Sequence, residues 1–502
     1  MKELVVEARR EFLEVARQWT GQYLAGQEGA EDPSAPIVLT GHQPELFHPG
    51  VWLKNFVAAQ IAENIGGIAV NVLIDNDRFK NSSVWILGGS PESPSLQSLP
   101  LDTDGANVPY EMRRVADWDL VSSFQERALS CLAPWVDNPL LTTYWPMVLA
   151  RLQSGPRLGH AVAQARNQLE ARWGSRIFDV PLGVVADLPT HQLFLAFVLA
   201  ELPQVAEVYN RSLDHYRVKH RLRNRAQPVP NLDRIGPWQE VPYWLWTNDD
   251  PTRRRLFVRL ESGAICLSDL RGWEVALPYQ RGEKLTRLAE LLRDLRQQGV
   301  YLRPRALMTT LFLRLIIGDF FVHGIGGARY DEVTDEIIGG LFGLEPPPYA
   351  VVSGTLWLAK PLGADFASEI RRTKHLLRDV KFHPEKFFLD CSSHGVSVVL
   401  SDPEVKEEVG LLIRKKHQWI ATPKTPENAR QRHYAISDAN QRLRSFLLDL
   451  ECQLRDRFGR LQELERQDTI LRFREFPFCF FPEQTLREFF AQATCQLGRR
   501  VV

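Results

Sequence analysis

The most constraining feature of the sequence is a strand, a polar loop, a helix and a second strand that follow one another without interruption. Ile37–Thr40 is a short run of β-branched and apolar residues that ends at Gly41, and Ala69–Ile74 is a second such run. Between them, Val51–Ile65 has the length and composition of a helix, and two glycines end it. Two strands joined by a crossover helix form a βαβ unit with parallel strands. The sequence therefore predicts an α/β protein.

Polar loops follow both strands, and ligands of parallel sheets bind beyond the carboxyl ends of the strands. The first loop, Gly41–Gly50, has glycines that let a ligand approach the backbone, and the helix after it offers free N–H groups. The second loop, Asp75–Lys80, carries carboxylates that accept hydrogen bonds from a sugar or an amine, or hold a hydrated Mg²⁺. The predicted site residues of the two loops are Gly41, His42, Gln43, His48, Gly50, Asp75 and Asp77, with both histidines and both aspartates in catalytic roles.

Each of these predictions has a simpler alternative. His48-Pro49-Gly50-Val51 is similar to the His-x-Gly-His signature of nucleotidyl-transferring sheets, in which imidazoles stabilise a phosphoryl transition state. The second histidine of that signature is Val51 here, so the match is incomplete. The histidines, glycines and prolines could instead only shape the turn, and Asp75 and Asp77 could be turn or cap residues.

A third cluster combines glycines with polar residues before a predicted helix. It consists of His323, Gly326, Gly327, Arg329 and Glu332. Backbone amides of a glycine loop bind a carboxylate or a phosphate, and an arginine adds a charge-assisted contact. The cluster lacks the spacing of a dinucleotide fingerprint, so a tight turn is the alternative.

Further strands and helices fill the rest of the chain. Pro181–Ala186, Val241–Trp246 and Leu256–Leu260 are predicted as strands. Leucines and a phenylalanine three and four residues apart within 426–468 predict a coiled-coil seam with one stutter at Phe458. A helical region of this kind either packs on the chain's own core or forms a homodimer. The expected organisation is an N-terminal helix and linker (1–35), an α/β core with insertions (36–360) and a helical, coiled-coil C-terminal region (361–502).

Composition narrows the class of function. Lysine plus arginine equals aspartate plus glutamate at 61 each, which does not favour nucleic acid as a partner. The six cysteines are dispersed without a Cys-x-x-Cys pair, and Cys391 and His394 have no second pair of ligands, so no metal site is predicted. An amphipathic N-terminus of mixed charge and the absence of a stretch of about 18 apolar residues predict a cytoplasmic protein that does not enter a membrane.

Several segments together resemble one family, the bacillithiol cysteine-adding enzymes (BshC family). Ile37–Gln43 resembles the family's Val-Val-Thr-Gly-Gln-Gln opening, and Ile74–Phe79 is similar to its strand ending in Glu-Asp-His-Asp-Phe. Glu240–Leu245 and Leu302–Arg314 continue the similarity, and Phe320–Glu332 is like the family's Gly-Gly-Pro-Gly-Glu segment. The order of these segments is the basis of the resemblance, which covers about residues 36–360.

The resemblance implies a Rossmann-like core of the nucleotidyltransferase type with inserted segments and a C-terminal coiled coil. It also implies a ligase that adds cysteine to glucosaminyl-malate, with ATP or ADP and Mg²⁺ as expected cofactors. The family's first loop glutamine is His42 here, the acidic run is Asp-Asn-Asp-Arg, and the glycine loop lacks its proline. A non-catalytic nucleotide- or sugar-binding protein and a sugar-nucleotide-dependent transferase are therefore kept as alternatives.

Overall fold

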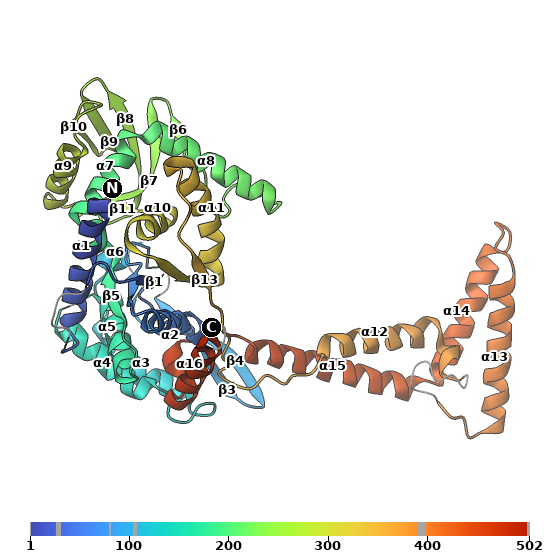
Figure 1. Cartoon of the computed structure of the whole chain (residues 1–502). Helices are drawn as coiled ribbons and strands as arrows, with labels where there is room; N and C mark the ends of the chain where they lie inside the picture. The colour runs from blue at the N-terminus through green and yellow to red at the C-terminus, as the bar shows by residue number, and fades with distance from the viewer. Residues whose placement is uncertain are drawn as a thin grey trace. The chain divides into compact units, whose positions relative to one another are not determined.

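The computed structural model describes residues 2–26, 32–79, 82–103, 108–155, 157–388 and 398–498. Cys391 and His394 lie outside these ranges. The chain divides into two compact units (Figure 1). The first comprises residues 1–91, 96–358 and 474–502, and the second comprises residues 92–95 and 359–473.

A five-stranded parallel sheet forms the centre of the first unit, which confirms the α/β prediction. Its strands are β1 (Ile37–His42), β2 (Ile68–Leu73), β5 (Phe178–Pro181), β12 (Phe320–His323) and β13 (Tyr349–Val351). They are ordered β13-β12-β1-β2-β5, and every neighbouring pair is parallel. The chain adds strands outward from β1 in one direction and then returns to its other side with β12. The order therefore reverses between β1 and β12, where a crevice opens at the carboxyl edge of such sheets.

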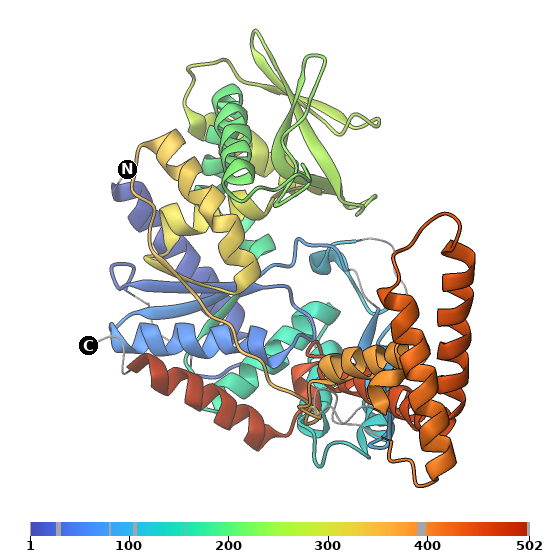
Figure 2. The same ribbon diagram turned by 90° about the vertical axis from the view of Figure 1, so that its right-hand side faces the viewer.

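Helices cover both faces of this sheet. The helices of the first unit are α1 (Lys2–Gly21), α2 (Pro49–Asn64), α3 (Trp118–Leu132), α4 (Leu141–Gln153), α5 (Leu158–Arg172), α6 (Leu182–Ala186), α7 (Pro189–Ala200), α8 (Leu202–Lys219), α9 (Leu285–Gln297), α10 (Ala306–Phe312), α11 (Ile325–Phe342) and α16 (Glu483–Gly498). Helix α2 packs on β1, β2 and β12, and α16 lies along α2 (Figure 2). On the other face, Phe12 and Ala16 of α1 share one buried apolar cluster with Leu39 and Val70. Alternate residues of a strand point to opposite faces, so both faces of these strands are buried.

A buried polar network ties α2, α5 and the strands together beneath the site described below. Arg166 of α5 donates to Asp179 of β5 at 2.7 Å, and its Nε lies 3.3 Å from a Glu170 oxygen. Asn71 of β2 donates to Asp179 at 2.8 Å, and Asn55 of α2 donates to Glu170 at 2.7 Å. Two buried carboxylates thus share one guanidinium, and burial raises the pKa of Asp179 to about 7.

An antiparallel sheet is inserted between α8 and α10 of the first unit. It is made of β6 (Arg234–Ile235), β7 (Trp238–Thr247), β8 (Arg254–Glu261), β9 (Ala264–Ser268), β10 (Glu274–Pro278) and β11 (Val300–Pro304). Its order is β10-β9-β8-β7-β11, with β6 beside β7, and the predicted strands at 241–246 and 256–260 lie in β7 and β8. The hairpin of β3 (Ser83–Ser90) and β4 (Ser93–Pro100) is separate.

Two local predictions were wrong. Residues 182–186 form helix α6 instead of continuing a strand, because β5 pairs with β2 only as far as Pro181, opposite Leu73, where β2 ends. The glycines 326 and 327 do not form a loop, since α11 already begins at Ile325 and they lie in its first turn.

The second unit consists of helices. They are α12 (Phe366–Phe382), α13 (Pro403–Ala421), α14 (Ala429–Ser445) and α15 (Leu448–Leu471), and α12 packs on α15 while α13 packs on α14. The prediction of one continuous seam was wrong, because the helix breaks at Phe446-Leu447. Leu443 then packs against α13, whereas Leu447 and Leu454 pack in a separate cluster with α12.

Among the described residues, no single helix is both long and apolar enough to cross a membrane. Helices α7 and α8 reach that length and composition only as a pair, and the two are bent by 87°.

Candidate functional site

A cavity of about 710 Å³ lies at the carboxyl edge of the parallel sheet and is here named the sheet-edge pocket. It is bordered by the ends of β1, β2 and β12 and by the first residues of α2, α10 and α11. The predicted site residues that line it are Gly41, His42, Gln43, His48, Gly50, Asp77, His323, Gly326 and Gly327. Three loops that are far apart in the sequence therefore meet in one pocket, at the point where the strand order reverses.

Two long helices begin at this pocket. Gly50 and Val51 in the first turn of α2 and Ile325–Gly327 in the first turn of α11 belong to its wall. The first N–H groups of a helix have no partner within the helix and carry partial positive charge. At α2 the N–H groups of Gly50 and Val51 already donate to His48, so α2 contributes its dipole, whereas the first turn of α11 can offer N–H groups to an anion.

Glycine is required at Gly50 by a close contact, whereas Gly326 faces open space. A Cβ atom built on Gly50 would lie 2.0 Å from the carbonyl oxygen of Gly354, so the loop after β13 packs directly on the start of α2. A Cβ atom on Gly326 would meet nothing within 4 Å among the described residues. Gly326 thus exposes its backbone to the pocket, which suits close approach of a ligand.

A buried lysine, Lys54, reaches the pocket from α2 and donates from Nζ to the carbonyl oxygen of Gly41 at 2.7 Å. Burial, with a smaller contribution from Arg166, lowers its pKa to about 7. Beside it, loss of hydration and the charge of Lys54 lower the pKa of His42 to about 3, so this imidazole is neutral. The pair offers an amine that is half-protonated near neutral pH next to an uncharged imidazole.

The imidazole of His48 has a structural role as the N-cap of α2. Its Nδ1 accepts from the N–H of Gly50 at 2.9 Å, and its Nε2 lies 3.2 Å from the carbonyl oxygen of Leu356. Since Nδ1 is an acceptor, the proton sits on Nε2 and is donated to that carbonyl. Burial also lowers the pKa of His48. With both nitrogens engaged, His48 shapes the wall and is not available as an acid or base in this conformation.

The carboxylate of Asp77 is held between two side chains. Gln43 donates to its Oδ2 at 3.1 Å, and Arg253 donates to its Oδ1 at 2.9 Å. Both oxygens are therefore engaged, which does not suit a protein ligand of Mg²⁺. The described residues also contain no group of three His, Cys, Asp or Glu side chains close enough to hold a metal ion.

The opposite wall carries an indole between two arginines. The guanidinium carbons of Arg253 and Arg305 lie 4.2 Å and 4.1 Å from the centroid of Trp244. Arg305 is fixed further by a 2.7 Å hydrogen bond to Glu240. Cations stacked on an aromatic face keep their in-plane N–H donors free for a ligand. Each of the two arginines is paired with a carboxylate, so this part of the wall presents positioned guanidinium groups whose charge is largely compensated.

His323 closes the pocket at the end of β12. Its ring stacks on Phe321 with centroids 4.1 Å apart, and its Nε2 is in ion-pair contact with Asp331. Asp331 also lies 3.3 Å from Arg314, which pairs with Asp335 at 2.7 Å. His323 is therefore anchored from behind by a buried charge cluster.

Three predicted residues lie outside the sheet-edge pocket. Asp75 is buried and directs its carboxylate to a second cavity, where it accepts from the N–H of Gly183 at 2.8 Å. Arg329 is exposed on α11, and Glu332 pairs with His220 at 2.7 Å. Both α11 residues therefore point away from the site because the helix starts earlier than the sequence suggested.

Several residues of the wall were not predicted from the sequence, namely Lys54, Trp244, Arg253, Arg305, Arg474 and Glu475. The sequence does contain a sign that Lys54 has a special role, because this lysine, next to Asn55, interrupts the apolar run of α2. The others come from the inserted sheet and the chain after the second unit, and no local pattern predicts that these segments return to β1.

No protein-family model matches this chain, and no curated protein is similar to it.

Proposed function

We propose that the chain is an enzyme that binds a phosphate-bearing small molecule in the sheet-edge pocket and joins an amino acid to an amine. The observation that carries this proposal is the meeting of the three predicted loops with two helix N-termini and several cations in one cavity. Cationic side chains gathered in one cavity of a chain with equal numbers of acidic and basic residues suit a small anionic ligand.

The strand order supports a Rossmann-like core. Numbered along the chain, the five parallel strands are ordered 3-2-1-4-5, as in the sheets that bind nucleotides at the switch between strands 1 and 4. The sheet-edge pocket lies at this switch. A nucleotidyltransferase type of core is part of the proposal, and ATP or ADP is the expected nucleotide.

Joining a carboxyl group to an amine requires activation of the carboxyl. Attack of a carboxylate oxygen on a nucleotide phosphorus gives an acyl-adenylate and diphosphate, or an acyl-phosphate and ADP. The amine of the acceptor then attacks the acyl carbon, releases AMP or phosphate, and loses a proton. Helix N-termini and stacked arginines stabilise charge that develops on phosphoryl oxygens.

Lys54 is the residue best suited to take the proton from the attacking amine. A general base works best with a pKa close to the working pH, and the pKa of Lys54 is lowered to about 7. The Nδ1 of the neutral His42 faces the carbonyl oxygen of Gln43 and carries the ring proton, so His42 would accept a hydrogen bond from the substrate at Nε2. His48 and Asp77 would position the walls, because their polar atoms are already engaged.

The resemblance to the bacillithiol cysteine-adding enzymes supplies the proposed substrates, cysteine and a glucosaminyl-malate-like acceptor. Three of the residues that differ from the family's loops, His42, Asn76 and Asp77, line the pocket. Another amino acid or amino sugar is therefore a variant of the same proposal.

Binding and product analysis together test it. Thermal-shift measurements with ATP, ADP, cysteine and glucosaminyl-malate should show stabilisation by a nucleotide, since a ligand of the folded state raises its stability. Gly326→Val should abolish the shift by filling the wall, whereas Gly339→Val on the same helix, which faces open space, should keep it. Thiol analysis of a deletion strain should show loss of a low-molecular-weight thiol, and an unchanged thiol pool would argue against bacillithiol-type synthesis.

A non-catalytic binding protein is the second candidate, and it is favoured by the engaged nitrogens of His48 and the engaged oxygens of Asp77. Such a protein would show the nucleotide shift and its loss in Gly326→Val, but would consume no ATP with any acceptor. A sugar-nucleotide-dependent transferase would instead be stabilised by a sugar nucleotide.

A further inference from the structure

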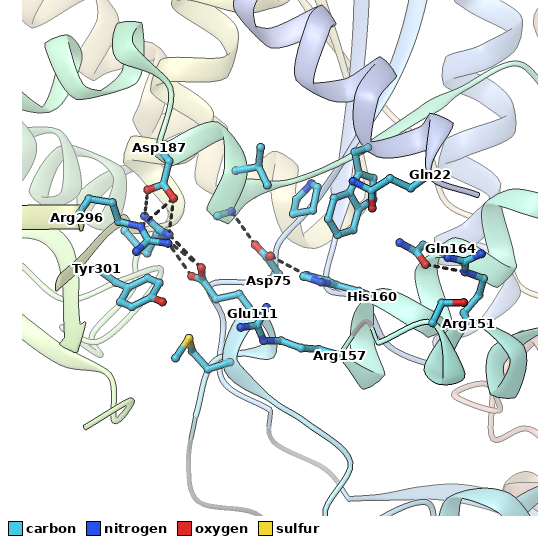
Figure 3. Close-up of a pocket in the computed structure, with 17 residues that line it drawn as sticks. Gln22, Asp75, Glu111, Arg151, Arg157, His160, Gln164, Asp187, Arg296 and Tyr301 are labelled. Atoms are coloured by element: carbon cyan, nitrogen blue, oxygen red, sulfur yellow. Dashed lines mark hydrogen bonds and ion pairs between the residues drawn. The ribbon is translucent and has the colours of Figure 1, made fainter. Parts of the chain in front are cut away.

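A second cavity, of about 330 Å³, lies on the other side of the β2 end and is here named the Asp75 pocket. Figure 3 shows Asp75 and His160 in its middle, with Arg151 and Gln164 toward one side. Asp187 and Arg296 lie toward the opposite side. It shares no lining residue with the sheet-edge pocket and does not depend on the function proposed for that pocket.

The carboxylates of the Asp75 pocket are already occupied by protein donors. Asp75 accepts from the N–H of Gly183 at 2.8 Å and lies 2.9 Å from Nε2 of His160. Arg303 donates from Nε to Glu111 at 3.0 Å and from Nη1 to Asp187 at 2.7 Å. These groups form a rigid, satisfied wall, because each acceptor has at least one short bond within the protein.

The two remaining arginines of the wall have no carboxylate partner among the described residues. Arg151 donates from Nε to the amide oxygen of Gln164 at 3.0 Å. The guanidinium of Arg157 makes no hydrogen bond or ion pair within the part of the chain that the structure describes, and its Nε is buried. The indole N–H of Trp19, which also lines the cavity, is likewise buried without an acceptor among described residues. A buried donor without an acceptor is costly, so the Nε of Arg157 and the indole N–H of Trp19 call for oxygen atoms from elsewhere.

The charge of the lining indicates the kind of ligand. Four arginines face three carboxylates, which leaves an excess of positive charge. An oxyanion would neutralise this excess and supply acceptors to Arg157 and Trp19 at once. The volume suits a molecule of metabolite size, and the wall of His160 and Asp75 would accept or donate a further hydrogen bond.

We infer that the Asp75 pocket is a second ligand site, which binds a small oxyanion, a carboxylate or a phosphate, through Arg151 and Arg157. Arg157 contributes the charge-assisted bonds, Arg151 the second charge, and the indole of Trp19 a neutral donor. The carboxylate and the phosphate share this chemistry, and the experiment separates them.

Calorimetric titration of the full chain with succinate and, separately, with inorganic phosphate tests the inference. Wild-type protein should bind at least one of the two, and Arg157→Gln and Arg151→Gln should each weaken that binding at least tenfold, the loss expected for a charged hydrogen bond. Arg176→Gln removes an exposed arginine outside both cavities and should bind as wild type. Circular dichroism of each variant verifies that it is folded.

Gly326→Val distinguishes the two anion sites. Because it alters only the sheet-edge pocket, binding that survives in Gly326→Val and is lost in Arg157→Gln belongs to the Asp75 pocket. The inference is overturned if folded wild-type protein binds neither anion, if both arginine variants bind as wild type, or if Gly326→Val alone removes the binding. Loss of anion binding in Gly326→Val alone would leave the function proposed for the sheet-edge pocket untouched. Conversely, a protein that binds the oxyanion but no nucleotide would count only against that proposed function.

Discussion

Replacing Lys54 with methionine should remove a large pH dependence of stability from the first unit. Methionine keeps the length of the side chain and deletes its charge. In the folded protein burial lowers the pKa of Lys54 from 10.5 to about 7. In the unfolded chain the amine recovers its ordinary pKa. Between these two values the unfolded state binds more protons than the folded state, so the stability of the wild type should rise as the pH is raised.

The magnitude follows from the size of the pKa difference. Each pKa unit corresponds to about 1.4 kcal/mol, so raising the pH from 7 to 10 should add about 4 kcal/mol to the contribution of Lys54. Lys54→Met lacks this contribution. Its free energy of unfolding should therefore exceed that of wild type most at pH 7, and the advantage should fall as the pH approaches 10.

Urea unfolding followed by tryptophan fluorescence measures this effect, because every tryptophan except Trp419 belongs to the first unit. The exposed Lys284, replaced by methionine, is the matched control and should leave the pH dependence of the wild type unchanged. If the stabilities of wild type and Lys54→Met stay parallel to within about 1 kcal/mol across this range, Lys54 has an ordinary pKa and cannot be the proposed base.

Two further substitutions test the packing beneath the sheet-edge pocket. Gly50→Ala should destabilise the fold by about 1–3 kcal/mol in urea unfolding, because its Cβ atom would overlap the carbonyl oxygen of Gly354. The control Gly339→Ala, whose Cβ atom would face open space, should be neutral or stabilising. Equal effects of the two substitutions would contradict the contact between Gly50 and Gly354. Arg166→Met should cost about 3–5 kcal/mol, because it leaves two buried carboxylates without their guanidinium, and Arg176→Met on the surface should cost little. A small loss for Arg166→Met would mean that these carboxylates are already protonated.

The parts of the fold that sequence predicted are those fixed by local pattern. Strand 37–42, one helix and strand 68–73 follow one another within a short stretch, and each has a recognisable local pattern. The loops after the two strands could therefore be predicted from the sequence to lie at one edge of a sheet. The helix at residues 182–186 could not be predicted, because its apolar sequence suits a strand as well as a helix. Which of the two forms depends on where β2, the pairing partner of β5, ends.

The candidate site was predictable to the same extent. Gly41, His42 and Asp77 follow the first two strands and were found by that rule, whereas Arg305 and Trp244 reach the pocket through an inserted sheet. Asp75 was predicted to share one site with Asp77 but lines the other cavity, because β2 ends at Leu73 and the chain turns at Asp75 and Asn76, where the alternation of strand residues no longer applies.

Two short segments, residues 75–77 and 303–305, each line both cavities. Asp75 and Arg303 line the smaller cavity, Asp77 and Arg305 line the larger one, and the side chain of Asn76 joins the segments by donating to the carbonyl oxygen of Pro304 at 2.7 Å. A substitution in either of these two segments should therefore perturb the sheet-edge pocket and the Asp75 pocket together. Mutagenesis that seeks to separate their roles must therefore draw its variants from the outer walls.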